Sequence, residues 1–380
     1  MRPPQVLVFL DWYRPGFQAG GPVRSMVNLA ERLQGRVQFH IATRNTDYRS
    51  STPYPEIEPD RWTPLPTGEQ VYYASAAGIR KARWRSLLRE RDWDAVYING
   101  IYSWWFSIVP LWLSRSMDVK RIVAVRGMLA PGPMRHGRSK KRAFLALART
   151  LGLYRGVHFH ATTEAEADEV RKWIDAHAQV TVVPNLPRAM AAEGMRPRIK
   201  VAGELTLVSL ARIAVEKNTH LALEALRGVH GKVSFHLFGA ITDETYWQRC
   251  LGIIAELPEN LTVHHRGVAD AEDVPSLLQG YHALLLPSAG ENFGHALLEA
   301  LAAGVPLVVS DRTPWRGLEE DHAGWDIPLG NMKRFTQVLQ QLVDMDQQAY
   351  DRWQRGAFAR AGRYLAGQDA EDRMLALFTT

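Results

Sequence analysis

The residues best placed for chemistry lie in one segment, PSAGENFGHALLEALAAGVP at 287–306. Its first half, rich in turn-forming residues, predicts a loop, and the small apolar residues after Gly294 predict a helix that a later glycine ends. Glu291 then precedes the helix and Glu299 lies inside it. At about 1.5 Å of rise per residue they are separated by roughly 12 Å, close to the length of a sugar-diphosphate-ribose unit. The amides of Phe293 and Gly294 lie between them, where helix-end donors suit a phosphate.

Two cations, Arg212 and Lys217, follow the apolar run Leu205 to Leu210. In parallel α/β domains, ligands bind beyond the carboxyl ends of the strands, so this loop is a place to search for them. Arginine supplies a planar fork of donors and lysine a mobile point charge, and together they could clamp a diphosphate. Taken alone, such a pair is more often solvated surface. The pair by itself therefore does not decide between a diphosphate clamp and two solvated side chains.

A pair of glycines, Gly20 and Gly21, lies between the first apolar run and a segment whose apolar residues share one helix face. Paired glycines let a backbone approach a phosphate closely. The alternative is a tight turn with Pro22 at the start of the helix, a position that proline favours. The sequence leaves both interpretations open.

The elements that must position these residues follow from the alternation of short β-branched runs with helical patterns. Such alternation predicts parallel sheets with crossover helices. The first series of runs is 6–10, 37–43, 95–98, 122–125, 157–161 and 180–183, and the second is 205–210, 233–238, 261–265, 283–286 and 306–310. The chain is therefore predicted to fold as two similar α/β units, each of the Rossmann-like type.

Proline sets the boundary between the units, because it fixes its own φ and disfavours helix in the residue before it. Pro184, Pro187 and Pro197 fall in the polar stretch between the two series. We therefore predict an N-terminal domain over 1–187, a linker over 188–200, a C-terminal domain over 201–360 and a closing helix over 361–380 that packs back toward the first domain.

The composition is that of a soluble globular protein, with 46% hydrophobic and 23% charged residues. Cys250 is the single cysteine, which excludes an internal disulfide and fits a reducing cytoplasm. The most lipid-like stretch, Tyr102 to Leu113, is interrupted by Pro110 and is far shorter than the roughly 20 residues that span a bilayer. We expect a cytoplasmic protein without a transmembrane helix.

The net charge of +6 allows an anionic partner without choosing between nucleic acid, anionic lipid and a phosphorylated substrate. The densest basic cluster is Arg135, Arg138, Lys140, Lys141 and Arg142. It is interpreted either as a solvated face or as a surface that docks on the inner face of an acidic plasma membrane beside a lipid-linked acceptor.

Taken together, these motifs resemble those of retaining glycosyltransferase family 4, in which two glutamates bracket seven residues. The resemblance covers most of the chain. It includes the glycine pair near the N-terminus, the Arg-x-x-x-x-Lys spacing of Arg212 and Lys217, the Pro-Ser before Glu291, and Gly304-Val305-Pro306 after the helix. It implies the GT-B fold, with two Rossmann-like domains facing across a cleft and a C-terminal helix that crosses back.

The resemblance also implies a role for each position. Glu299 would hold the ribose hydroxyls of a nucleoside-diphosphate sugar, and Glu291 with the residues after it, Asn292, Phe293 and Gly294, would contact the donor sugar. The cations at 212 and 217 would neutralise the leaving diphosphate, and the glycines at 20 and 21 would approach it from the other domain. No metal and no cofactor are expected.

One departure concerns the residue after the run Ile122 to Val125. Many family members place a histidine before glycine there, whereas this chain has Arg126-Gly127. It shares that feature, and Thr313-Pro314-Trp315, with a polysaccharide-assembly subgroup. A guanidinium stays charged and will not act as a base at neutral pH. Arg126 is therefore expected to stabilise donor or acceptor charge, with a structural salt bridge as the alternative.

The sequence thus predicts a retaining, metal-independent transferase that moves a hexose-type sugar to a hydroxyl of a glycan or lipid-linked oligosaccharide, in exopolysaccharide, O-antigen or capsule assembly. Nucleic acid is not expected as a partner. A sugar-nucleotide epimerase or phosphorylase of the same fold is one alternative. A catalytically silent nucleotide-sugar-binding protein is the other.

Overall fold

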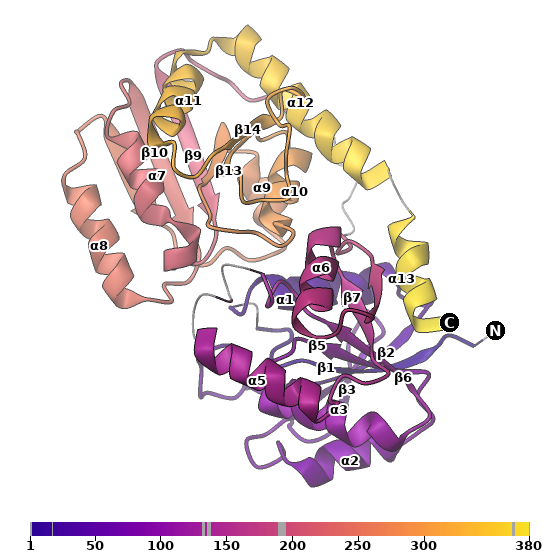
Figure 1. The fold of residues 1–380 in the computed structure, drawn as a ribbon. Helices are drawn as coiled ribbons and strands as arrows, with labels where there is room; N and C mark the ends of the chain where they lie inside the picture. The colour runs from indigo at the N-terminus through magenta and orange to yellow at the C-terminus, as the bar shows by residue number, and fades with distance from the viewer. Residues whose placement is uncertain are drawn as a thin grey trace. The chain divides into compact units, whose positions relative to one another are not determined.

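The computed structural model describes residues 2–16, 18–130, 134, 138–188, 195–366 and 369–379, with no side chain described for Arg138. The chain divides into two compact units, which comprise 1–190 with 368–380, and 191–367 (Figure 1). Arg135 of the basic cluster and 189–194 of the predicted linker lie outside the described residues.

The N-terminal unit is built on an eight-stranded sheet in the order β3-β4-β2-β1-β5-β6-β7-β8, parallel except for β3 against β4. The strands are β1 (Gln5–Phe9), β2 (Gln38–Arg44), β3 (Trp62–Pro64), β4 (Gln70–Ala74), β5 (Ala95–Asn99), β6 (Lys120–Ala124), β7 (His158–Ala161) and β8 (Gln179–Val182). Six of them lie where alternation predicts strands. The hairpin of β3 and β4 is an addition that extends one edge.

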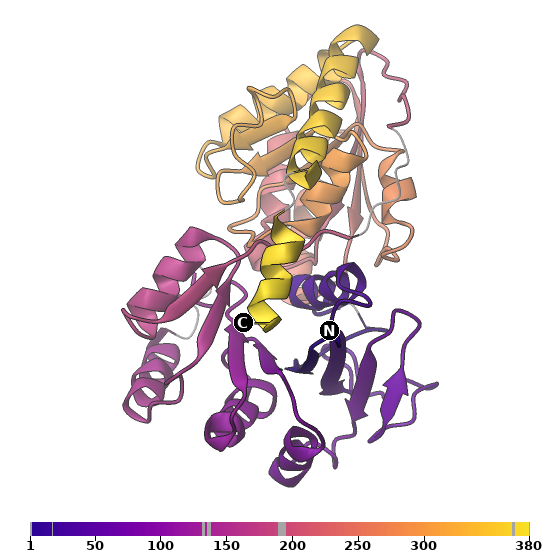
Figure 2. The ribbon, with the colours of Figure 1, turned by 90° about the vertical axis from the view of Figure 1, so that its right-hand side faces the viewer.

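Helices cover both faces of this sheet. Those that contribute to two separate cores are α1 (Gly21–Arg32), α2 (Lys81–Arg89), the π-helical turn Trp104–Ile108 with α3 (Val109–Leu113), α5 (Arg138–Thr150), α6 (Glu164–Trp173) and α13 (Ala370–Thr379). A short 3₁₀ turn, Ser114–Ser116, follows α3. The core that contains α1 also receives Met374, Leu377 and Phe378 of α13. Figure 2 shows the ribbon of α13, in yellow, beside the strands of the N-terminal unit.

The C-terminal helix therefore belongs to the N-terminal unit. Arg32 of α1 forms an ion pair with Glu371, and the Phe378 ring meets those of Phe39 and Tyr97 edge-on. The predicted helix over 361–380 is two elements in the structure, because α12 (Gln347–Ala366) ends in one unit and α13 begins at Ala370 in the other.

The C-terminal unit has an all-parallel sheet in the order β11-β10-β9-β12-β13-β14. Its strands are β9 (Glu204–Leu210), β10 (Lys232–Phe238), β11 (Leu261–His265), β12 (Ala283–Leu286), β13 (Leu307–Ser310) and β14 (Gly324–Ile327). The first five are at the predicted positions. The short strand β14 completes the edge and was not predicted.

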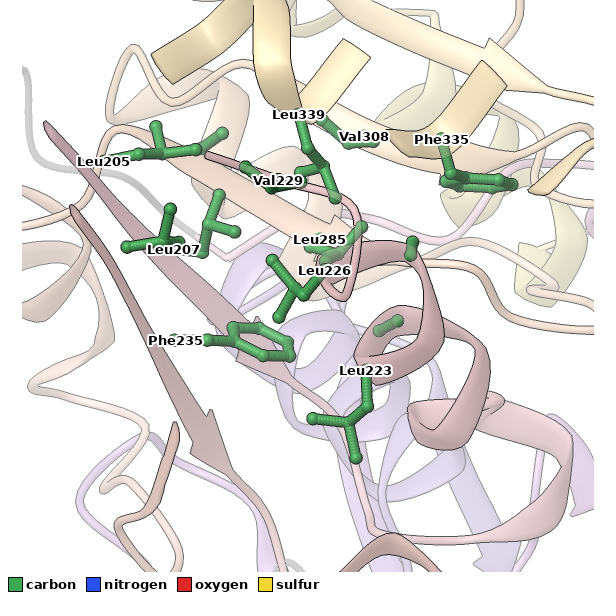
Figure 3. Packing of buried hydrophobic residues seen from close by; sticks show 14 of the residues in the cluster. Leu205, Leu207, Leu223, Leu226, Val229, Phe235, Leu285, Val308, Phe335 and Leu339 are labelled. Atoms are coloured by element: carbon green, nitrogen blue, oxygen red, sulfur yellow. The ribbon is translucent and has the colours of Figure 1, made fainter. Parts of the chain in front are cut away.

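Its helices are α7 (Thr219–Leu226), α8 (Glu244–Ala255), α9 (Val274–Leu278), α10 (His295–Ala302), α11 (Met332–Asp344) and α12, with a 3₁₀ turn at Val215–Lys217. Apolar side chains of β9, β10, α7 and α11 interdigitate in the largest core, as Figure 3 shows for Leu207, Phe235, Leu223 and Leu339. None of the helices in the described part of the chain has the length and apolar character that a bilayer crossing requires.

Part of the predicted linker is built into the C-terminal unit. Arg198 and Lys200 are both buried. The Lys200 ammonium donates to the carbonyls of Val201, Val343 and Met345 at 2.8–3.0 Å. The structured C-terminal unit consequently begins before residue 201.

Candidate functional site

In the sheet of the C-terminal unit, the order in which strands are added reverses between β9 and β12. The chain builds β9, β10 and β11 outward on one side and then returns to place β12 against the other side of β9. At such a switch point the loops that leave neighbouring strands turn opposite ways and leave a crevice where ligands bind. The loops after β9 and β12 contain Lys217 and Glu291.

Hydrogen bonds tie these two loops together. Asn218 donates its side-chain amide to the Pro287 carbonyl at 2.9 Å, and the Ala289 amide donates to the Glu216 carbonyl at 2.8 Å. The fully buried Ser288 hydroxyl lies within hydrogen-bond distance of two carbonyls, Glu216 at 3.3 Å and Gly290 at 3.0 Å, and its one proton is shared between them. The backbone around Lys217 is thereby fixed against the segment that leads to Glu291.

The Lys217 Nζ lies 2.6 Å from Oε1 of Glu291, and both side chains are more than four-fifths buried. Sequence reasoning selected both residues but did not predict that they pair across 74 positions. Arg212, at the start of the same loop, pairs with Glu216 at 3.2 Å and is partly exposed. Two cations and two carboxylates thus share this edge of the sheet in balanced pairs.

The helix α10 starts where the sequence predicts, because Gly294 caps it. Gly294 has φ of 77°, and a Cβ there would lie 2.8 Å from Leu297 Cδ1, so the position requires glycine. Before it, Phe293 is buried and its carbonyl accepts from the Trp315 indole at 3.0 Å. Asn292 and Glu291 therefore sit on a loop that is anchored at both ends.

Glu299 lies inside α10 and is half-buried. The predicted separation of the two glutamates assumes a helical rise of about 1.5 Å per residue. Because α10 begins only at His295, that rise applies from His295 to Glu299 and not to the residues before it. The prediction that one carboxylate precedes the helix and the other lies within it is confirmed, and Gly304, with φ of 68°, follows its last residues as predicted.

A buried arginine holds the other end of α10. Arg198 donates to the carbonyls of Gln279, Ala303 and Gly304, at 2.9 Å to the first and 2.7 Å to the last. A cation at a helix C-terminus satisfies free carbonyls and complements the negative end of the helix dipole. Arg198 thus fixes the helix that carries Glu299.

We expect Arg198→Ala to lower the melting temperature of the protein by several degrees, because two buried carbonyls and one part-buried carbonyl lose their donor, at about 1–3 kcal/mol for each lost charged hydrogen bond. Arg198→Lys should recover little, since an ammonium cannot reproduce the fork. Arg352→Ala on the exposed face of α12 is the matched control. Equal melting curves for Arg198→Ala and the control would contradict this role.

In the N-terminal unit the switch point lies between β1 and β5. Gly20 caps α1 with φ of 79°, and Pro22 occupies the first turn, as the turn interpretation predicts. Gly21 differs, because it has no positive φ and a Cβ there would meet no atom within 4 Å. Neither backbone conformation nor packing explains a glycine at 21.

Arg126 lies at the end of β6, is buried, and has φ of 52°, which is uncommon for a residue with a side chain. Its guanidinium donates to the side-chain oxygens of Asn99, Asn185 and Tyr97, at 2.5 Å to the first and 2.8 Å to the last. All three acceptors are neutral, so within the described residues the structural salt bridge does not form.

The chain of hydrogen bonds continues to His160. Because Arg126 can only donate, the Tyr97 hydroxyl accepts from it and gives its own proton to His160 Nδ1 at 2.8 Å. His160 Nε2 then donates to the Val183 carbonyl at 2.9 Å. Burial, and next the Arg126 charge, lower the pKa of His160 to about 3, so the ring is neutral at physiological pH.

This pKa predicts acid sensitivity in the N-terminal unit. The pKa of His160 in the folded protein is far below its unfolded value of about 6.5, so below pH 6.5 only the unfolded chain takes up this proton. The free energy of unfolding therefore falls by about 1 kcal/mol for each pH unit below 6.5. We expect the melting temperature to fall from pH 7 to pH 5 and to fall less in His160→Phe. The exposed His264→Phe is the control, and parallel curves for all three proteins would refute the assignment.

Sequence reasoning missed several polar residues at this edge. Asp11, directly after β1, accepts from Ser103 at 2.9 Å and pairs with Arg44, while burial raises its pKa. Glu166 accepts from the amides of Gly127 and Thr162. Their position after a strand or in the first turn of a helix was the available signal.

No set of three or more histidine, cysteine or acidic side chains in the described ranges is grouped so that it could hold a metal ion.

Comparison with known proteins places this geometry in a family. The sequence model of glycosyl transferases group 1 matches residues 193–360, and that of the glycosyl transferase 4-like domain matches 20–186. Together these two matches cover most of the chain, which belongs to the glycosyltransferases that the two models describe. Each match falls within one α/β unit. The first contains the β9/β12 switch point, and the second contains Gly20, Gly21 and Arg126.

Two curated members of the glycosyltransferase family match part of the chain. D-rhamnosyltransferase WbpZ of Pseudomonas aeruginosa is 30% identical over 168 residues, which are 43% of this chain and 39% of the relative. WcaL of Escherichia coli, assigned to colanic acid biosynthesis, is 26% identical over 158 residues, which are 40% of this chain and 39% of the relative. The matched part spans about two fifths of each relative.

A solved structure, Anabaena Alr3699/HepE in complex with UDP-glucose, aligns with a TM-score of 0.70 at 15% identity over 99% of this chain and 100% of that one. This likeness establishes the glycosyltransferase fold. The predicted fold class, two Rossmann-like α/β domains of the GT-B type with a C-terminal helix, is confirmed.

Proposed function

We propose that the chain transfers a hexose-type sugar from a nucleoside diphosphate to a hydroxyl of a glycan or lipid-linked acceptor, with retention of the anomeric configuration. The observation that carries the proposal is the Lys217–Glu291 pair at the β9/β12 switch point, beside the start of α10. It combines a cation for a diphosphate with a carboxylate for sugar hydroxyls.

The cations act on the leaving group. In the free chain Lys217 and Arg212 are each paired with a glutamate. An arriving diphosphate offers both cations a more highly charged partner and frees Glu291 to accept hydrogen bonds from sugar hydroxyls. Because both pairs lie on loops fixed by hydrogen bonds, little reorganisation is needed when charge develops on the leaving oxygen.

Glu299 and Gly21 complete the donor contacts that the family resemblance implies. Glu299 lies inside α10, after the loop that carries Glu291, and accepts hydrogen bonds from the ribose hydroxyls. Gly21 approaches the diphosphate through its backbone. The absence of any conformational or steric need for glycine at 21 supports this role.

Retention follows from attack on the face that the diphosphate leaves. The bond between the anomeric carbon and the phosphate oxygen breaks as the acceptor oxygen bonds to that carbon, and the departing phosphate oxygen takes the acceptor proton. The protein supplies position and charge stabilisation. Arg126 is buried among neutral acceptors, so its charge contributes positive potential toward the bound reactants.

The proposed reaction requires no metal, because Lys217 and Arg212 balance the charge of the diphosphate. We expect transfer to continue at an unchanged rate after dialysis against EDTA. The comparison is the same protein with added Mg²⁺ or Mn²⁺. A loss of activity that either ion restores would show that a metal takes part.

The acceptor and its location are proposed from the relatives. WbpZ and WcaL are named for rhamnosyl transfer and for colanic acid biosynthesis, and assembly of a surface polysaccharide at the inner face of the plasma membrane fits both. In the basic cluster, however, Lys141 lies over the Tyr102 ring and Arg142 over the Trp173 ring. Of the side chains described in this cluster, Lys140 and Arg142 are exposed and Lys141 is half-buried.

Donor binding is the experiment that tests the proposal first. HepE is described with UDP-glucose, so UDP-glucose and GDP- and TDP-sugars form the initial panel in a thermal-shift screen. A bound donor should stabilise the protein by about 2.7 kcal/mol at a hundredfold excess over Kd. Product analysis then separates transfer from epimerisation, phosphorolysis and silent binding.

A further inference from the structure

A second polar site lies in the N-terminal unit, at the end of its sheet opposite Gly21 and Arg126. The helix α2 ends just before β5, and α3 with its 3₁₀ turn ends just before β6. These helix ends therefore lie at the amino ends of the parallel strands, whereas Gly21 and Arg126 lie at the carboxyl ends. Between them is a pocket of about 440 Å³.

Three arginines line this pocket, Arg85 and Arg89 from α2 and Arg115 from the 3₁₀ turn. Of the described residues that line it, none is acidic. Within that part of the chain Arg85 and Arg89 make no ion pair or side-chain hydrogen bond, and Arg115 donates to the Leu151 carbonyl at 3.2 Å. The acidic neighbour Glu90 accepts instead from the Trp62 indole.

Such a cluster is electrostatically unbalanced. The C-terminus of α2 favours one nearby cation through the helix dipole, but three guanidinium groups around one hollow repel each other and keep most of their donors free. Arginine presents a fork that matches phosphate oxygens. The pocket therefore suits a phosphate-bearing anion.

Exposed apolar side chains accompany the same pocket. The Trp112 side chain lines it and is 49% exposed, with the Lys81 ammonium 4.1 Å from its ring centroid. Leu151, whose carbonyl binds Arg115, is 63% exposed, and Leu147 one helical turn earlier is 58% exposed. Exposed leucines and an indole beside arginines match the boundary between lipid headgroups and acyl chains.

We propose that this surface, formed by Arg85, Arg89, Trp112, Arg115 and Leu151, docks on an anionic membrane, with the phosphate of a lipid headgroup in the arginine pocket. A free phosphate would gain nothing from the exposed apolar side chains. This docking surface is separate from the transfer site, so either could exist without the other. It also differs from the basic cluster at the start of α5.

The test is co-sedimentation of the full chain with vesicles of phosphatidylcholine alone or mixed with phosphatidylglycerol. Arg85→Glu, Arg89→Glu and Arg115→Glu in one protein should reduce binding to the anionic vesicles by about tenfold or more. The matched control, Arg249→Glu, Arg352→Glu and Arg355→Glu, has the same net charge and exposed sites in the other unit. It should bind like the wild type.

Trp112→Ala should also weaken vesicle binding, which a purely electrostatic surface would not show. The three arginines are exposed, so all variants should keep the wild-type melting temperature and their donor hydrolysis in solution. Equal loss in the arginine variant and its control would overturn the proposal. Binding of polyglutamate without binding of vesicles would assign the surface to an acidic protein instead.

Discussion

Lys217→Ala is expected to lower kcat by about 10²- to 10³-fold, the usual effect of removing one preorganised group that stabilises developing charge. The Lys217 ammonium is held in place by Glu291 and by a loop that hydrogen bonds fix on both sides. It therefore cannot be replaced by a solvated cation nearby. Steady-state kinetics with the best donor from the screen, together with melting curves, measure the effect.

The control for this substitution is Lys232→Ala. Lys232 also pairs with a glutamate, Glu204 at 3.6 Å, but its side chain is 81% exposed, and such surface pairs contribute little. The control should retain wild-type kinetics and stability. A stable Lys217→Ala protein with wild-type kcat would remove the cation from the mechanism.

The two glutamates should differ in which kinetic constant they change. Glu291 is expected to contact the sugar as its charge shifts, so Glu291→Ala should lower kcat, by about 10²-fold, more than it raises the donor KM. Glu299 is expected to contact the ribose, which does not react. Glu299→Ala should therefore raise the donor KM about 10- to 100-fold, as loss of a charged hydrogen bond of about 1.5–3 kcal/mol would do.

The Lys217–Glu291 pair adds a condition to this prediction. Glu291→Ala leaves a largely buried ammonium without its partner, so part of the effect could arise through Lys217. Glu291→Gln keeps a hydrogen-bond acceptor and the shape of the side chain, and it should recover part of kcat if the carboxylate binds the sugar. Glu256→Ala, at an exposed surface pair, is the control. Unchanged donor kinetics in both stable glutamate variants would show that the segment is structural.

The sequence was sufficient to predict the fold, because the strand signals and the glycines that bound α10 are local. The strand runs 205–210 and 283–286 need only their own β-branched and apolar residues, and Gly294 needs only its positive φ. The hairpin of β3 and β4 and the strand β14 were missed, since short edge strands carry little hydrophobic pattern of their own. The division of the last helical stretch between two units was also missed, because the unit that a helix packs against is set by tertiary contacts and not by its own sequence.

The arrangement of the site could be predicted only in part. The residue types that bind a diphosphate sugar were visible, but their partners depend on tertiary contacts. Lys217 meets Glu291 because two loops that leave adjacent strands are hydrogen-bonded together. Arg126 is surrounded by Tyr97, Asn99 and Asn185, which come from other elements, so spacing in the sequence could not show that its acceptors are neutral.

The most direct test of the central claim is the configuration of the sugar in the product. The protein is incubated with its preferred nucleoside-diphosphate sugar and an acceptor, and the anomeric proton of the purified product is followed by NMR. Front-face transfer at the β9/β12 switch point predicts a product with the anomeric configuration of the donor and one equivalent of released nucleoside diphosphate. An inverted product, or a sugar that is changed without transfer, would contradict the account.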